Sequence, residues 1–95
     1  MHMKKMTILH SKTCPYCEQA IAFLDALREK KEYYNKIPLE LIDEAEHPEV
    51  MEEYDYFYLP AIFWGKEKLH EGACTQEDIE NALIRAEWDL QRAIK

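Results

Sequence analysis

The sequence has 95 residues, of which 47% are apolar, and it carries a formal net charge of −7. This length allows one modest hydrophobic core, so residues 1–95 are expected to form a single domain. The acidic balance excludes nucleic acid as an expected partner, because binding a phosphate backbone requires clustered Lys and Arg. No apolar run approaches the ~20 residues that span a membrane, and the polar start Met1-His2-Met3-Lys4-Lys5 lacks the long apolar stretch of a signal peptide. We therefore expect a cytoplasmic monomer that does not bind membranes.

The strands and helices of the N-terminal half are predicted from apolar patterning and proline positions. Met6 to His10 is a short apolar run with β-branched residues, which predicts a buried strand. A helix is predicted from Pro15 to Lys31, because proline is favoured at the first helical position and an apolar stripe follows it. Pro38 cannot donate to a sheet and marks the start of a strand over Leu39 to Ile42. A short helix fits His47 to Tyr54.

The C-terminal half predicts a hairpin followed by a long helix. Ala61 to Trp64 and Lys68 to His70 flank Gly65-Lys66, a pattern that indicates a β-hairpin. Thr75 to Asp78 resembles a capping box with Asp in place of Glu. Apolar residues at helical spacing then predict a closing helix from Gln76 to about Ala93. The predicted order of elements is βαβαββα.

The segment from Ile37 to Gly65 contains eight acidic residues and no Lys or Arg. A solvated acidic face explains this composition, and a docking surface for a basic partner is the alternative. The aromatic run from Tyr54 to Tyr58 lies within the same segment.

Cys14 and Cys17 form a C-x-x-C pair where the first predicted helix begins. Without an export signal, the three cysteines are not expected to form a structural disulfide framework. Zinc sites use the same spacing but need four ligands, and only Cys74 and four scattered histidines remain. We therefore expect no metal and no bound cofactor.

A redox role explains the position of the cysteine pair. Unpaired N–H groups and the positive end of the helix dipole favour a thiolate at Cys14. Cys17 lies one turn further on, where side chains are ~5–6 Å apart and a disulfide can close with slight adjustment. Lys12 either supports the thiolate, holds an anionic substrate or is a solvated loop residue. Tyr16 is expected to face the substrate, because the start of a helix leaves the ring little to pack against.

Lys-x-Cys-Pro-Tyr-Cys at Lys12 to Cys17, with Leu59-Pro60 later in the chain, is typical of glutaredoxins, and the sequence resembles that family over nearly its whole length. The resemblance implies an α/β thioredoxin-like fold, with a four-stranded mixed sheet flanked by helices and the first and last helices on one face. It also implies a thiol-disulfide oxidoreductase that reduces protein disulfides or glutathione mixed disulfides, with Cys14 attacking and Cys17 resolving. Pro60 would be cis beside the cysteines, with the Leu59 backbone pairing with the substrate. Considered without the resemblance, Pro60 fits an ordinary trans proline at the start of a strand, and a cis bond is the less common form.

The chain departs from glutaredoxins after the predicted hairpin. That family usually has Gly-Gly followed by Cys-Asp or Ser-Asp, which hold a glutathione carboxylate, whereas this chain has Glu71 to Thr75. Glu71 brings a negative charge, and Gly72, Thr75 and the N–H groups that open the last helix remain to bind the carboxylate. The electron donor is therefore either glutathione or a thioredoxin reductase, as in glutaredoxin-like redoxins. Cys74 is interpreted as a structural or spare thiol.

A redox-inactive module that binds partners through its aromatic and acidic segment is the competing function. The intact cysteine pair argues against this alternative.

Overall fold

The strands and α-helices follow one another along the chain in the predicted order βαβαββα. The computed structural model describes residues 4–94, so the start Met1-His2-Met3 lies outside the described residues. The structure also contains a 3₁₀ helix, η1, which the sequence does not predict. The elements are β1 (Met6–His10), α1 (Pro15–Lys30), η1 (Glu32–Lys36), β2 (Leu39–Asp43), α2 (Val50–Glu53), β3 (Ala61–Trp64), β4 (Glu67–Glu71) and α3 (Gln76–Ile94).

Four strands form one mixed sheet in the spatial order β2-β1-β3-β4. β1 pairs in parallel with β2 and antiparallel with β3, and β4 pairs antiparallel with β3. The central strands β1 and β3 are buried on both faces, which explains their nearly uninterrupted apolar sequences. This topology brings the C-terminal ends of β1, β2 and β4 and the N-terminal end of β3 to one end of the sheet.

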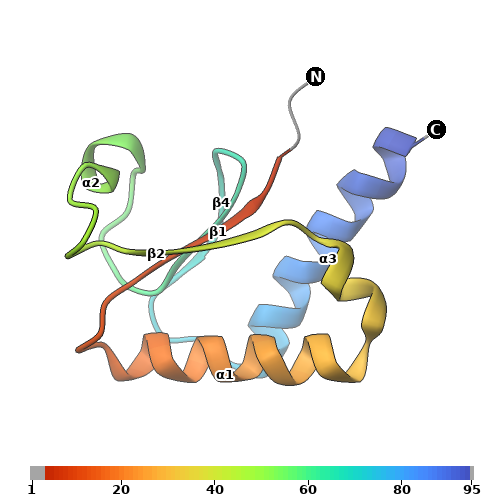
Figure 1. Cartoon of the computed structure of the whole chain (residues 1–95), viewed down its shortest axis with the longest axis horizontal. Helices are drawn as coiled ribbons and strands as arrows, with labels where there is room; N and C mark the ends of the chain where they lie inside the picture. The colour runs from red at the N-terminus through yellow and green to blue at the C-terminus, as the bar shows by residue number, and fades with distance from the viewer. Residues whose placement is uncertain (1–3, 95) are drawn as a thin grey trace.

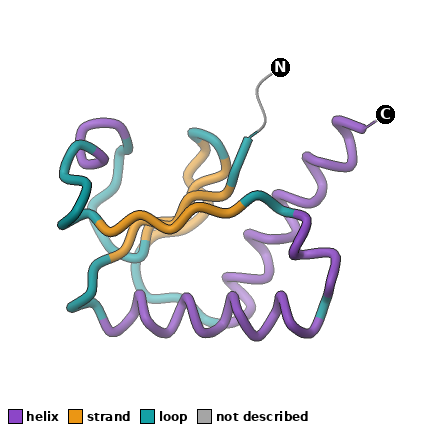
Figure 2. The backbone as a smooth tube through the Cα atoms, in the orientation of Figure 1, coloured by secondary structure: helices purple, strands orange, loops and turns teal. Residues whose placement is uncertain are grey.

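The helices α1 and α3 cover the same face of the sheet, as predicted, and contact each other (Figure 1). Figure 2 shows the strands as one layer with α1 beneath it. Leu24 and Leu27 of α1 and Ile79 and Leu83 of α3 share a buried core with Ile8 of β1. Burying each of these side chains stabilises the fold by roughly 1.5–3 kcal/mol.

A smaller core covers the opposite face of the sheet. Leu9, Ala61 and Phe63 are buried there against Val50 of α2. The Tyr54 ring packs on the Phe63 ring, with the two centroids 4.8 Å apart. The segment around α2 is thereby held near the end of the sheet at which α1 begins, as Figure 1 shows.

Two elements differ from the sequence prediction. The α2 helix spans only Val50–Glu53, because residues 44–49 form turns rather than a regular helix. The helix η1 follows α1 because Tyr34 is buried and its hydroxyl donates to Glu80 of α3 over 3.0 Å. One buried tyrosine in a polar stretch leaves no apolar period, so the pattern of residues 32–36 does not predict a helix.

Within residues 4–94, no helix combines the length and the apolar character that crossing a membrane requires.

Candidate active site

Cys14 is the N-cap residue of α1, at the end of the sheet where the loops converge. Its N–H donates to the Ser11 carbonyl over 3.2 Å, which closes a tight turn after β1. Pro15 then starts the helix, as predicted. The Cys14 sulfur accepts the Cys17 N–H at 3.2 Å, so it fills the place of a capping oxygen. Partial positive charge at this terminus favours a negative sulfur.

The two cysteines differ in exposure. Both are free thiols; Cys14 is half-buried, whereas Cys17 is only 1% exposed. Burial raises the pKa of the Cys17 thiol to about 12, and the neighbouring Cys14 sulfur adds to the shift. Because the thiolate is the nucleophile, this environment makes Cys17 much less reactive toward an external disulfide. Cys14 is therefore the more accessible of the two sulfurs.

The Leu59–Pro60 peptide bond is cis, which confirms the prediction for Pro60. It lies beside the first cysteine, because the Cys14 thiol donates to the Leu59 carbonyl over 3.8 Å. Pro60 is fully buried, and its carbonyl accepts the Gly72 N–H at 2.9 Å. Among residues 4–94, the Leu59 N–H has no hydrogen-bond acceptor. The main chain at Leu59 is therefore available to pair with another extended chain.

Glu71 has a different place from the one the sequence suggests. We expected its carboxylate to face a bound glutathione, but it is bound within the protein. One oxygen accepts the N–H groups of Phe57 and Tyr58, at 2.8 and 3.2 Å, and the other accepts Lys68 Nζ at 2.8 Å. The Lys68 ammonium and then the Phe57 N–H lower the pKa of Glu71 to about 2. Glu71 thus fixes the segment that leads to the cis peptide bond.

Thr75 and Asp78 form the predicted capping box at the start of α3. The Thr75 N–H donates to the Asp78 carboxylate over 2.9 Å, and the Asp78 N–H donates to Thr75 Oγ1 over 3.1 Å. Gly72 has φ +86°, a backbone conformation that favours glycine, and its N–H donates to the Pro60 carbonyl. The donors that the sequence left for a glutathione carboxylate at Thr75 and Gly72 are therefore engaged within the protein.

The other predicted site residues lie around the same end of the sheet. Lys12 is 77% exposed and pairs with Glu46 at 3.2 Å. Tyr16 is 51% exposed, and its contact with a substrate stays a prediction. Cys74 is half-buried against the main core, and burial followed by the Asp78 charge raises the pKa of its thiol. This placement agrees with a structural or spare thiol.

A hollow of about 510 Å³ opens beside Cys14. Glu44 and Met51 line it from the β2–α2 side, and Tyr56 and Phe57 line it from the segment before Pro60. The Tyr56 hydroxyl donates to Glu44 Oε2 over 2.6 Å. Burial and the hydrogen bond to Glu44 raise the pKa of Tyr56. Sequence reasoning did not single out Glu44; its position directly after β2, which is parallel to β1, is the signal that places it here.

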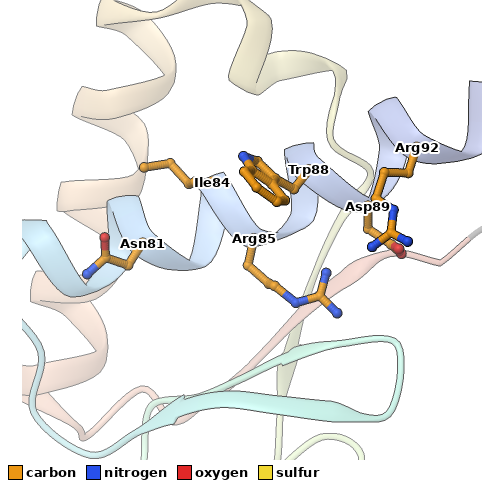
Figure 3. A pocket seen from close by; sticks show the side chains of 6 residues that line it. All are labelled: Asn81, Ile84, Arg85, Trp88, Asp89 and Arg92. Carbon is orange, nitrogen blue, oxygen red and sulfur yellow. The ribbon is translucent and has the colours of Figure 1, made fainter.

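A second hollow, also of about 510 Å³, lies on the outer side of α3. Its lining residues all come from that helix and include Ile84, Arg85 and Trp88 (Figure 3). It contains no cysteine and is separate from the site at Cys14. Among the residues that the structure describes, no group of three or more His, Cys, Asp or Glu side chains is placed to hold a metal ion.

Comparison with solved structures defines the fold class. A protein described as a malarial protein superposes with a TM-score of 0.67 at 19% identity, covering 90% of this chain and 98% of that one. The germline-specific thioredoxin Deadhead of Drosophila melanogaster superposes with a TM-score of 0.64 at 18% identity, covering 86% and 79%. The four-stranded mixed sheet flanked by helices is therefore the thioredoxin-like fold.

Sequence comparison then identifies the family, although no family model matches the chain. A protein of Methanothermobacter thermautotrophicus described as "Probable Thioredoxin" is 36% identical over 76 residues, covering 80% of this chain and 87% of the relative. A protein of Methanothermobacter marburgensis with the same description is 34% identical over 79 residues, covering 83% and 91%. The chain belongs to the thioredoxin family.

Proposed function

We propose that this protein is a dithiol oxidoreductase that reduces disulfide bonds in other proteins. The placement of Cys14 carries the proposal: its sulfur caps α1 3.2 Å from the Cys17 nitrogen and lies 3.8 Å from the Leu59 carbonyl. A nucleophilic sulfur thus adjoins both a resolving thiol and a main-chain segment open to an extended substrate. Membership of the thioredoxin family supports the same chemistry.

The proposed reaction moves two electrons from the cysteine pair to the substrate. The Cys14 thiolate attacks one sulfur of the substrate disulfide, which forms a mixed disulfide and releases the other substrate sulfur as a thiolate. Cys17 then loses its proton and attacks the Cys14 sulfur, which forms the Cys14–Cys17 disulfide and releases the second substrate thiolate. The two protons of the dithiol end on the two substrate thiols, so the protein is oxidised and the substrate reduced.

A protein reductase is the proposed electron donor, in preference to glutathione. The Glu71 carboxylate, which lies in the segment where the resemblance to glutaredoxins implies a contact with glutathione, is bound within the protein by the Phe57 and Tyr58 N–H groups. The N–H groups of Gly72 and Thr75 are likewise engaged, and both donate to other residues of the chain. The sequence relatives are described as thioredoxins, which supports the same choice.

A side-by-side reduction assay tests this function. The oxidised protein is incubated with glutathione or with NADPH and a thioredoxin reductase, and its free thiols are counted against time. We expect rapid reduction by the reductase and slow reduction by glutathione, with dithiothreitol as the positive control. Glutathione as the faster donor would contradict the proposed donor. No disulfide reduction by dithiothreitol-treated protein would contradict the oxidoreductase itself.

A further inference from the structure

The hollow beside Cys14 has an exposed apolar wall. Met51, Phe57 and Tyr58 line it and are 62%, 80% and 68% exposed. The Phe57 and Tyr58 amides are held by Glu71 at 2.8 and 3.2 Å, so the backbone of these two residues is held in place before any partner arrives. Large apolar side chains that stay exposed next to a reactive group indicate a contact surface.

The lining of the hollow also includes one acidic residue, on its β2–α2 side. Glu44 lines it with its carboxylate bound to the Tyr56 hydroxyl at 2.6 Å. The segment from Glu44 to Asp55 holds six acidic residues and no Lys or Arg. The neighbouring cation Lys12 is paired with Glu46 at 3.2 Å, and Lys66 lies over the Tyr54 ring at 4.6 Å. A carboxylate that lines a cleft, with further acidic residues in the same segment, attracts ligands of positive charge.

We propose that the substrate of this site is a basic polypeptide, which is bound as an extended segment with its disulfide at Cys14. An apolar side chain of that segment packs on Met51 and Phe57, and a Lys or Arg near the disulfide faces Glu44. This inference rests on the proposed oxidoreductase function and names its substrate class. A second copy of this chain is a poor occupant, because each copy carries a net charge of −7.

Matched peptides test the inference. Three disulfide peptides that differ only in carrying Arg, Gln or Glu beside the cysteines are mixed with the reduced protein, and oxidation of Cys14 is followed by acid quench and alkylation. We expect the Arg peptide to react about tenfold faster than the Glu peptide at about 20 mM salt, and at most about twofold faster at about 0.5 M salt. The rate for the neutral Gln peptide should lie between the rates for the Arg and Glu peptides.

Charge variants identify the responsible residue. Glu44→Gln should reduce the low-salt ratio to about threefold or less, because it removes the carboxylate that lines the hollow together with Cys14. Glu29→Gln is the matched control; it removes the same charge from the exposed far end of α1 and should leave the ratio unchanged. If Glu44→Gln alters the loop, the fall of the Arg-to-Glu rate ratio with salt in the unmodified protein still tests whether charge sets the preference.

Equal rates for the Arg and Glu peptides at low salt would overturn the inference and leave the proposed function intact. A preference that Glu44→Gln does not reduce would also overturn it, because the charge would then act from elsewhere. If no peptide oxidises the reduced protein, the proposed oxidoreductase function fails and the inference fails with it.

Discussion

The different environments of the two active-site thiols predict a large difference in their reactivity. Burial and the neighbouring sulfur raise the pKa of Cys17 from 9.0 to about 12. Near pH 8 this shift lowers its thiolate fraction about 900-fold relative to an unfolded thiol. A more basic thiolate is intrinsically more nucleophilic by about 16–32-fold over three pKa units. The two effects combine to make native Cys17 react about 30–60-fold more slowly than unfolded Cys17.

Alkylation of single-cysteine variants tests the direction of this difference, because burial, the largest cause of the raised pKa of Cys17, remains when Cys14 is replaced. In the variant Cys14→Ser/Cys74→Ser, only Cys17 remains, and its reaction with iodoacetamide is followed by mass spectrometry with and without denaturant. Steric protection by the fold can only widen the predicted difference, since Cys17 is 1% exposed. The control variant Cys17→Ser/Cys74→Ser keeps Cys14 and should react readily in its native state. A native Cys17 alkylated within a few-fold of the unfolded rate, in a variant that circular dichroism shows to be folded, would refute the assignment of roles.

Two further predictions concern stability and loop anchoring. Folding lowers the pKa of Glu71 from 4.5 to about 2, so its stabilising contribution is present above pH 4.5 and is lost as the pH falls toward 2. Glu71→Gln should flatten this part of the stability-against-pH curve and slow disulfide reduction. If neither the curve nor the rate changes, the bonds from the Phe57 and Tyr58 amides to Glu71 do not matter for stability or activity. Leu24→Ala should lower the free energy of unfolding by about 2–5 kcal/mol in denaturant titrations, because the Leu24 side chain of α1 is buried in the core that α1 shares with α3 and the sheet. A loss well under 1 kcal/mol would contradict this packing.

Much of the fold follows from local sequence signals. The apolar run of β1, Pro15 at the start of α1 and the Thr75–Asp78 capping box each place an element boundary within a residue or two. These signals act over a few residues, so they can be read without knowing the tertiary contacts. The helix η1 escapes such reading because it depends on the hydrogen bond from Tyr34 to Glu80, which joins residues far apart in the chain.

The same distinction separates the predicted and the missed parts of the site. The cysteine pair has a diagnostic spacing, and Leu59-Pro60 matches a family pattern, so both could be found in the sequence. The partners of Glu71 could not, because its carboxylate meets the Phe57 and Tyr58 amides only after β4 pairs with β3. The Glu44–Tyr56 hydrogen bond likewise joins two loops that the sheet topology brings together.

Trapping of the mixed disulfide tests the assignment of Cys14 and Cys17 most directly. Cys17→Ser/Cys74→Ser removes the resolving thiol, so this variant should accumulate a covalent complex with an oxidised protein such as insulin, which dithiothreitol then releases. Cys14→Ser/Cys74→Ser should form no such complex, because the remaining Cys17 is buried. For both variants, the presence or absence of the complex is read on a non-reducing gel, and its mass is measured by mass spectrometry. A complex formed by the variant that lacks Cys14, or none formed by the variant that keeps it, would contradict the account.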